Sequence, residues 1–319
     1  MLQALRGDFF CLPFGGNDTV FRGEKHPPHG ETANARWQFE SLDSAEGRPT
    51  LRLGLQTTVR LGRVQKEIML ADDQNVVYCK HTISGMSGPM NLGHHAMLKF
   101  PEAPGSGVIS TSPFAYAQVF PGDFEKAESY GYSCLKAGAE FSSLRSVPLA
   151  VGGNADLTHY PARRGYEDLV MLVSEMGVPF AWTAVTFPQQ RYVWFALKNP
   201  RVLRETVFWI SNGGRHYPPW SGRHTGVMGL EEVTSYFHHG LAESVQPNPI
   251  SAKSFPTCLT LDPAHPLVVP YIMGAVPIAW KCDHVSSIEP AEGGSAICLC
   301  FDNGQRLTVA VDVDFLAVL

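Results

Sequence analysis

Apolar and polar residues alternate with a period of two along much of this chain. In the run Leu51–Leu61, leucine and valine side chains alternate with arginine, glutamine and threonine, and the run Leu307–Phe315 repeats the pattern with threonine and aspartate. Successive side chains of a β-strand point to opposite faces of the sheet. A period of two therefore indicates strands with one face in the core and the other in water, and we expect both runs to be strands.

Three further runs are rich in the β-branched and aromatic residues that favour strands: Val76–Ile83, Tyr192–Leu197 and Thr206–Ile210. Proline and glycine, 24 and 30 residues in all, punctuate the chain and leave little room for long helices. The best helical candidate is short, at 123–129, and residues 240–256 are expected to form a loop. The sequence predicts an all-β fold, a large antiparallel β-sandwich.

Composition indicates an ordered globular protein. Of the 319 residues, 44% are hydrophobic and 17% are charged, and neither a repeat nor a linker-like change of composition divides the chain. We therefore predict a single domain over residues 1–319. The net charge of -5 argues against nucleic acid and against an anionic membrane surface as partners, and favours a small, weakly charged ligand.

The cysteines and the N-terminus bear on the compartment. Seven cysteines, including Cys282 and the neighbouring Cys298 and Cys300, lack the even number and spacing of a disulfide framework, so we expect reduced thiols. The first ten residues show no signal peptide, and no run approaches the roughly 20 apolar residues of a membrane span. The cytoplasm is the expected location.

Four short clusters combine imidazoles with carboxylates. They are His29-Gly30 followed by Trp37, then Asn91–His95, Gly165–Asp168 and Gly229–Glu232. Proton-transfer chemistry needs one group that can donate a proton near neutral pH and one carboxylate that can accept it. We therefore take these clusters as the candidate site.

In this order the clusters resemble the aldose 1-epimerase (galactose mutarotase-like) family. That family carries an early His-Gly and a Trp, an Asn-Leu-x-Asn-His segment, a Gly-Tyr-Asp segment and a late catalytic Glu. The matching segments lie between Phe9 and Tyr236 of this chain. The resemblance implies a galactose mutarotase-like supersandwich and an isomerase that interconverts sugar anomers without a cofactor.

The resemblance also implies roles for individual residues. His95 would be the general acid that protonates the ring oxygen of a pyranose, and Glu231 the general base that takes the proton of the anomeric hydroxyl. His29 and Glu167 would bind sugar oxygens. Trp37 is expected to serve partly as a core residue and partly as a platform for the apolar face of the sugar.

Strand geometry limits these assignments. Glu231 and Glu232 are adjacent on an expected strand, so only one of them can face a cleft, and the Leu230 before them together with the family pattern favours Glu231. The same constraint applies to His94 and His95.

The segment Ser211–His224 is expected to be a ligand-facing loop. It carries two arginines, two histidines, a tyrosine and a tryptophan between glycines and prolines. Arg215, Trp220 and Arg223 are its candidate substrate-binding residues, because loops on rigid strands commonly hold binding groups and arginine binds hydroxyl or anionic groups. Hydrogen bonding of these arginines to loop carbonyls is the alternative.

Differences from the family pattern keep other functions open. Only 28 residues precede His29, and Gly15 and Gly16 stand where the family often has Asn-Arg. Absent N-terminal strands would leave an edge that a homodimer contact can cover. A carbohydrate-binding protein that has lost turnover is the main alternative to an epimerase. A metal-dependent enzyme using His26, His29, His94 and His95 is the third.

Overall fold

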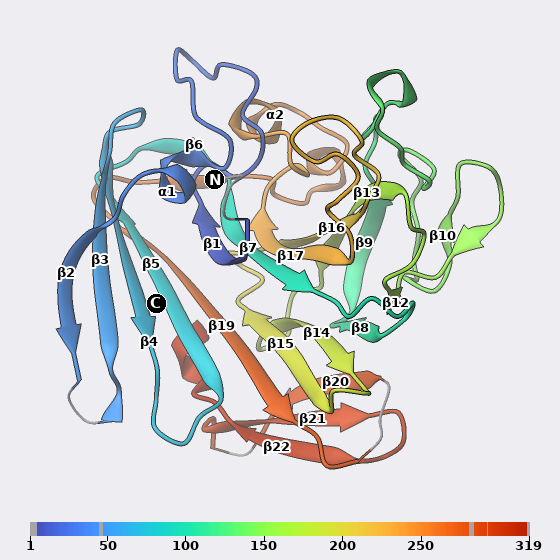
Figure 1. Cartoon of the computed structure of the whole chain (residues 1–319). Coiled ribbons are helices and arrows are strands. Elements are labelled where there is room, and N and C mark those ends of the chain that lie inside the picture. The colour runs from blue at the N-terminus through green and yellow to red at the C-terminus, as the bar shows by residue number, and fades with distance from the viewer. Residues whose placement is uncertain (1–4, 45–46, 281–283, 292, 318–319) are drawn as a thin grey trace.

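A computed structural model describes residues 5–44, 47–280, 284–291 and 293–317. Within these ranges the chain folds into three layers of antiparallel β-sheet (Figure 1). Cys282, which was expected to be a reduced thiol, and the first four residues, part of the stretch in which no signal peptide was expected, lie outside the described part of the chain.

The middle layer, called the back sheet, has nine described strands. Its order across the sheet is β12 (His159–Tyr160), β8 (Gly107–Thr111), β14 (Ala181–Phe187), β15 (Tyr192–Lys198), β19 (Leu267–Pro277), β5 (Val76–Ser84), β4 (Gly62–Met69), β3 (Thr50–Thr57) and β2 (Gln38–Asp43).

The front sheet has six strands in the described ranges. Their order is β1 (Gly7–Cys11), β7 (Leu92–Lys99), β17 (Val227–Thr234), β16 (Glu205–Asn212), β13 (Tyr166–Ser174) and β9 (Phe114–Val119). The third layer, the C-terminal sheet, holds β20 (Val285–Pro290), β21 (Ala296–Phe301) and β22 (Arg306–Ala310).

The remaining described elements are short. Two small sheets pair β10 (Val147–Pro148) with β11 (Asn154–Ala155), and β18 (Leu259–Leu261) with β6 (Gly88–Met90). The described helices are α1 (Gly30–Asn34), α2 (Leu241–Val245) and the 3-10 turns η3 (Ala127–Ser129), η4 (Ser251–Lys253) and η5 (Val313–Leu316). None of them has the length or apolarity to cross a membrane.

Side chains alternate between the two faces of the back sheet, so one apolar core lies between the back and C-terminal sheets and another between the back and front sheets. On β15, Phe195 packs with Ile297 and Leu299 of the C-terminal sheet, and the neighbouring Trp194 faces the front sheet. A further apolar cluster, which includes Leu169 and Val207, covers the outer face of the front sheet, where loops pack against it. That outer face carries the candidate site.

The all-β prediction is confirmed, and the three runs Val76–Ile83, Tyr192–Leu197 and Thr206–Ile210 lie in β5, β15 and β16. The run Leu51–Leu61 is not one strand, because a turn at 58–61 separates β3 from β4. The run Leu307–Phe315 leaves the sheet after Ala310.

The helical expectations were largely wrong. Only η3 forms within 123–129, whereas α1 was not foreseen and α2 and η4 interrupt the expected loop at 240–256. Each of these helices has five residues or fewer, which is too short for a helical period to show in the sequence. The single-domain organisation stays a prediction.

Candidate functional site

A histidine and a glutamate lie side by side on the outer face of the front sheet. His95 of β7 is the cross-strand partner of Glu231 of β17, and its Nε2 lies 3.2 Å from Glu231 Oε1. Both side chains are only 3% exposed. The antiparallel register alone therefore brings together two residues that are 136 positions apart in the chain.

His29 reaches the same place from an irregular segment before α1. Its ring centroid lies 5.0 Å from that of His95, and Phe9 of β1 stacks on His95 with ring centroids 4.5 Å apart. The backbone N–H of Gly15 donates to His29 Nδ1 at 3.4 Å. Because Nδ1 accepts this bond, the neutral ring carries its proton on Nε2 and offers a donor at that nitrogen.

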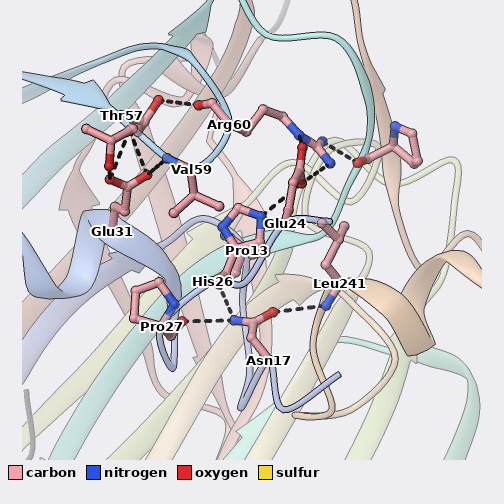
Figure 2. A network of polar contacts seen from close by, with 12 residues as sticks. Pro13, Asn17, Glu24, His26, Pro27, Glu31, Thr57, Val59, Arg60 and Leu241 are labelled. Atoms are coloured by element: carbon pink, nitrogen blue, oxygen red, sulfur yellow. Dashed lines mark hydrogen bonds and ion pairs between the residues drawn. The ribbon is translucent and has the colours of Figure 1, made fainter. Parts of the chain in front are cut away.

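Polar side chains tie the segment that carries His29 to the rest of the fold (Figure 2). The amide nitrogen of Asn17 donates to the carbonyls of Pro13, at 3.3 Å, and Pro27, at 3.2 Å, and its oxygen accepts from the N–H of Leu241 at 3.0 Å. Glu31 in α1 accepts hydrogen bonds from the backbone of the turn between β3 and β4. These bonds hold His29 in position although no strand carries it.

His29, His95 and Glu231 line a cavity of about 100 Å³. Aromatic side chains supply much of its wall, which the front sheet, the N-terminal segment and three loops build together. The lining residues are Leu5, His29, His95, Phe124, Leu169, Trp209, Arg215, Trp220, Glu231 and His238.

Arg215 is the charged residue that the loop 211–224 contributes to this cavity. Its guanidinium lies over the rings of Trp209, Trp220 and Phe124 at 5.0–5.3 Å, and its Nε donates to Glu125. Such aromatic faces attract a cation through the ring quadrupole. The arginine is therefore held rigidly at the wall of the cavity rather than free in solvent.

Burial shifts the acid–base groups toward their uncharged forms. Desolvation lowers the pKa of His95 well below its usual range and raises the pKa of Glu231 well above its own. The same effect lowers the pKa of His29 to about 4 and that of His238 to about 3. The pair His95–Glu231 therefore favours one shared proton and no net charge.

A glycine makes room for this pair. A Cβ placed on Gly229, two residues before Glu231 on the same face of β17, would lie 2.5 Å from Glu231 Oε1 and 3.3 Å from His95 Cε1. Any larger residue at this position would push the carboxylate out of its place.

The neighbouring residues His94 and Glu232 face the interior between the front and back sheets. Glu232 accepts hydrogen bonds from Thr183 at 2.6 Å and Thr206 at 2.7 Å, and pairs with the buried Lys198 at 2.5 Å. His94 Nδ1 lies 2.9 Å from Asp8 Oδ2. The structure thus places Glu231 and His95, rather than Glu232 and His94, at the cavity, as alternation along a strand requires.

Glu167 lies behind the cavity and not in its lining. It is fully buried and accepts hydrogen bonds from Trp209 Nε1 at 3.0 Å and Ser211 Oγ at 2.8 Å. Desolvation raises its pKa to about 7, although the nearby Arg215 opposes this shift. The contact of Glu167 with a ligand stays a prediction; in this structure its carboxylate holds the Trp209 ring, which does line the cavity.

Trp37 and Arg223 also lie away from the cavity. Trp37 donates to the carbonyl of Thr32 at 3.0 Å and packs against the core between the two large sheets, with Lys66 over its ring. Arg223 is exposed, and its guanidinium donates to the carbonyl of Pro219 at 3.4 Å. Neither residue lines the cavity in this structure, and the sugar platform at Trp37 and the ligand contact of Arg223 stay predictions.

Sequence reasoning missed Trp209, Phe124 and His238. Trp209 was assigned to a strand without a role. Val207 is the cross-strand partner of Glu231, and Trp209 lies two residues further along β16, so its side chain points to the same face as that of Glu231. Alternation would have found Trp209 once that register was known. Phe124 and His238 come from loops, for which the sequence contains no such signal.

The four histidines of the metal hypothesis do not converge. His26 Nε2 lies 3.0 Å from Glu24 and His94 faces Asp8, so only His29 and His95 share the cavity. Within the described ranges, no group of three or more histidine, cysteine or acidic side chains is placed to hold a metal ion. The six described cysteines are free thiols.

The three-layer architecture is similar to that of several solved structures. A candidate aldose 1-epimerase from Escherichia coli K12 matches over 85% of this chain and 84% of its own, with a TM-score of 0.55 and 14% identity. A galactose mutarotase related enzyme from Lactobacillus acidophilus matches over 86% and 84%, with a TM-score of 0.53 and 12% identity. The fold is galactose mutarotase-like.

A galactose mutarotase-like protein from Clostridium acetobutylicum adds a third match, over 85% of this chain and 79% of its own, with a TM-score of 0.52 and 12% identity. Neither a protein-family model nor a curated protein sequence matches the chain. At these identities the likeness concerns the galactose mutarotase-like fold and leaves the chemistry to the residues of the cavity.

Proposed function

We propose that this protein is an aldose 1-epimerase-like isomerase that interconverts the α and β anomers of a sugar at the cavity around His95 and Glu231. The observation that carries the proposal is the direct 3.2 Å contact of an imidazole and a carboxylate, both buried, in a cavity with aromatic walls. Tryptophan rings suit the apolar C–H face of a pyranose. The galactose mutarotase-like fold supports the same reaction class.

The contact suits the chemistry of ring opening. The ring oxygen and the anomeric hydroxyl are bonded to the same carbon, so the acid and the base that serve them must be neighbours. Side-by-side placement on adjacent strands meets this requirement.

One shared proton is sufficient for the reaction. Glu231 as carboxylate takes the anomeric proton, His95 as imidazolium protonates the ring oxygen, and the bond between that oxygen and the anomeric carbon breaks to give the aldehyde. The pair then holds a protonated Glu231 and a neutral His95, which are the forms that burial favours. Rotation of the aldehyde and the reverse transfers close the ring on either face.

The substrate-binding groups follow from their positions. The Nε2–H of His29 is a donor for a sugar oxygen, and Trp209 and Trp220 supply apolar faces. Arg215 can donate to a hydroxyl or an anionic substituent. No step requires a cofactor, because each one is a proton transfer coupled to one C–O bond.

The experiment is to follow anomer exchange by NMR with the purified protein, over a panel of free sugars and sugar acids. We expect the wild type to accelerate exchange, and the variant His95→Asn to lower the rate by about 10² or more, as for loss of a general acid. The exposed His265 supplies the control variant His265→Asn, which should retain the wild-type rate. Equal exchange with and without the protein across the panel would refute the proposal.

A carbohydrate-binding protein without turnover is the second candidate. The segment Gly15-Gly16 favours it, because the aldose 1-epimerase family often has Asn-Arg there and the sugar contact of that arginine is missing. Saturable sugar binding in calorimetry, with no accelerated exchange, would select this function.

A further inference from the structure

Two cysteines lie side by side on the outer face of the C-terminal sheet. Cys298 and Cys300 are two residues apart on β21, so their side chains point to the same face of the strand. Ile297 and Leu299, which alternate with them, pack into the core on the opposite face. The sulfur atoms of the two cysteines are 3.9 Å apart. Neither thiol lines the cavity of the candidate active site.

The face that carries the two thiols is turned to solvent. In the sheet register Glu289 of β20 and Thr308 of β22 flank Cys298, and Arg306 of β22 flanks Cys300. The side chains of Arg306 and Glu289 are 63% and 53% exposed, and Thr308 is exposed as well. Cys298 itself is 9% exposed, and Cys300 is half-buried. An ion in solution therefore approaches the pair from this face of the sheet.

A cationic side chain lies against one of the sulfurs. Arg306 Nε donates a hydrogen bond to Cys298 Sγ at 3.2 Å, and the same guanidinium donates to Glu289 Oε2 at 3.4 Å. A neighbouring arginine stabilises the thiolate, which is the form of cysteine that binds metal ions. The surroundings of Cys298 therefore favour its metal-binding form.

The strand keeps the two cysteines from forming a disulfide with each other. Cα atoms two residues apart on a strand are about 6.8 Å from each other, which is the upper limit of the Cα separations that disulfides usually span, about 4.4–6.8 Å. Both thiols are free in this structure. The pair is therefore held as a dithiol with both sulfurs available to one ligand.

The spacing of the sulfurs suits a metal ion bound to both of them. Bonds between a metal ion and a thiolate are about 2.3 Å long, so one ion can join sulfurs up to about 4.6 Å apart. The observed separation of 3.9 Å lies within this limit. One ion can thus bind both sulfurs without moving the strand.

The number of ligands and the charge favour a soft monovalent ion over a divalent one. Within the described ranges, no third histidine, cysteine or acidic side chain completes a group with the two thiols, whereas zinc sites typically have three or four protein ligands. Thiolates select soft ions such as Cu⁺. Two thiolates around a monovalent ion carry one net negative charge, which Arg306 offsets.

We propose that Cys298 and Cys300 form a binding site for a soft monovalent metal ion of the Cu⁺ class. Each thiol loses its proton and each sulfur forms one bond to the ion, so that binding of one Cu⁺ releases two protons and changes no oxidation state. Arg306 balances the remaining negative charge. The inference does not depend on the sugar chemistry proposed for the front sheet.

The test measures the affinity of the whole chain for Cu⁺ in the absence of oxygen. Ascorbate keeps the copper monovalent, and the protein competes for it with the coloured chelator bicinchoninate. Competition with 4-(2-pyridylazo)resorcinol gives the affinity for Zn²⁺. We expect one Cu⁺ per chain, bound at least a hundredfold more tightly than Zn²⁺. Equal affinities for the two ions, or no competition for Cu⁺, would overturn the proposal.

Matched variants locate the ion. Cys298→Ser and Cys300→Ser each remove one sulfur, so each should weaken Cu⁺ binding at least a hundredfold. Cys258→Ser, at a half-buried free thiol elsewhere in the chain, is the control and should leave the affinity unchanged. Arg306→Gln should weaken binding at least threefold, with a smaller effect at high salt. An affinity that neither Cys298→Ser nor Cys300→Ser lowers would place the ion elsewhere and refute the inference.

A measurement on the wild type avoids any dependence on the folding of a variant. Alkylation by iodoacetamide, read by mass spectrometry, compares the thiols with and without one equivalent of Cu⁺. We expect the ion to protect Cys298 and Cys300 together and to leave Cys258 as reactive as before. Protection of Cys258 instead, or no change at Cys298 and Cys300, would contradict the proposed site.

Discussion

The two faces of β7 and β17 use the same residue types in opposite ways. On the outer face, His95 and Glu231 contact each other and a cavity, and burial displaces the pKa of each toward its neutral form. On the inner face, Glu232 has Lys198 and two threonine hydroxyls as partners. A carboxylate with all its partners inside the protein has a structural role, and one with spare capacity at a cavity is available for chemistry.

The largest expected effect is on the outer face. Glu231→Gln keeps the shape of the side chain but cannot accept a proton, so anomer exchange measured by NMR should fall by about 10² to 10⁴. The free energy of unfolding should stay the same or rise, because the wild-type carboxyl is buried. Full activity in this variant would remove Glu231 from the reaction and break the comparison.

The inner face should show the reverse pattern. Glu232→Gln leaves the buried Lys198 without its counter-charge, and breaking such a pair typically costs about 3–5 kcal/mol of stability. Urea unfolding followed by circular dichroism measures this loss. Adding Lys198→Met to Glu232→Gln should recover part of it, and no recovery would contradict the assignment of the loss to an uncompensated charge.

The space beside Glu231 offers a milder test. Gly229→Ala puts a methyl group 2.5 Å from the present position of Glu231 Oε1, so the carboxylate must move. We expect a loss of exchange activity of roughly 10²-fold, as small misplacements of reacting groups can cause. The alanine variant of the exposed Gly304, whose φ is positive unlike that of Gly229, tests for a general effect of added backbone strain elsewhere in the fold.

The pH dependence of stability follows from the desolvation of the half-buried His29 at the cavity. His29 has a pKa near 4 in the folded protein and an ordinary value of 6.5 when unfolded. Below pH 6.5 the unfolded chain therefore takes up a proton that the folded protein refuses, and folding is penalised increasingly down to about pH 4. Above pH 6.5 His29 contributes no such dependence.

The measurement compares urea unfolding of the wild type and His29→Asn at pH 7.5, 5.5 and 4.5. The wild type should lose stability relative to the variant as the pH falls through this window. A difference between the two proteins that does not change with pH would show that His29 is not buried in its neutral form.

The smallest expected effect concerns Trp37, which the sequence had placed at the site. Its half-buried ring packs against the core between the two sheets and does not line the cavity. Trp37→Leu should therefore change the affinity for sugar less than twofold in calorimetry, while it lowers stability. A large loss of affinity at unchanged stability would restore Trp37 to the site.

The sequence by itself determined the all-β class and the fact that the two residues of each adjacent pair point to opposite faces of the sheet. Period-two alternation is a local property of the strand, so His94 had to oppose His95 and Glu232 had to oppose Glu231 before any contact was known. The strands β5, β15 and β16 were found from another local property, their content of β-branched and aromatic residues. The short helices were not, because five residues do not complete two helical turns.

Only the tertiary structure decided which residues meet. The register of β7 against β17 brings His95 beside Glu231. The irregular segment between β1 and α1, held by the hydrogen bonds of Asn17, places His29 at the same cavity. Trp37 and Glu167 belong to the four sequence clusters, but neither lines the cavity. Trp37 packs against the core between the two large sheets, and Glu167 lies behind Trp209. Such encounters depend on contacts between distant segments, and no periodicity along one segment encodes them.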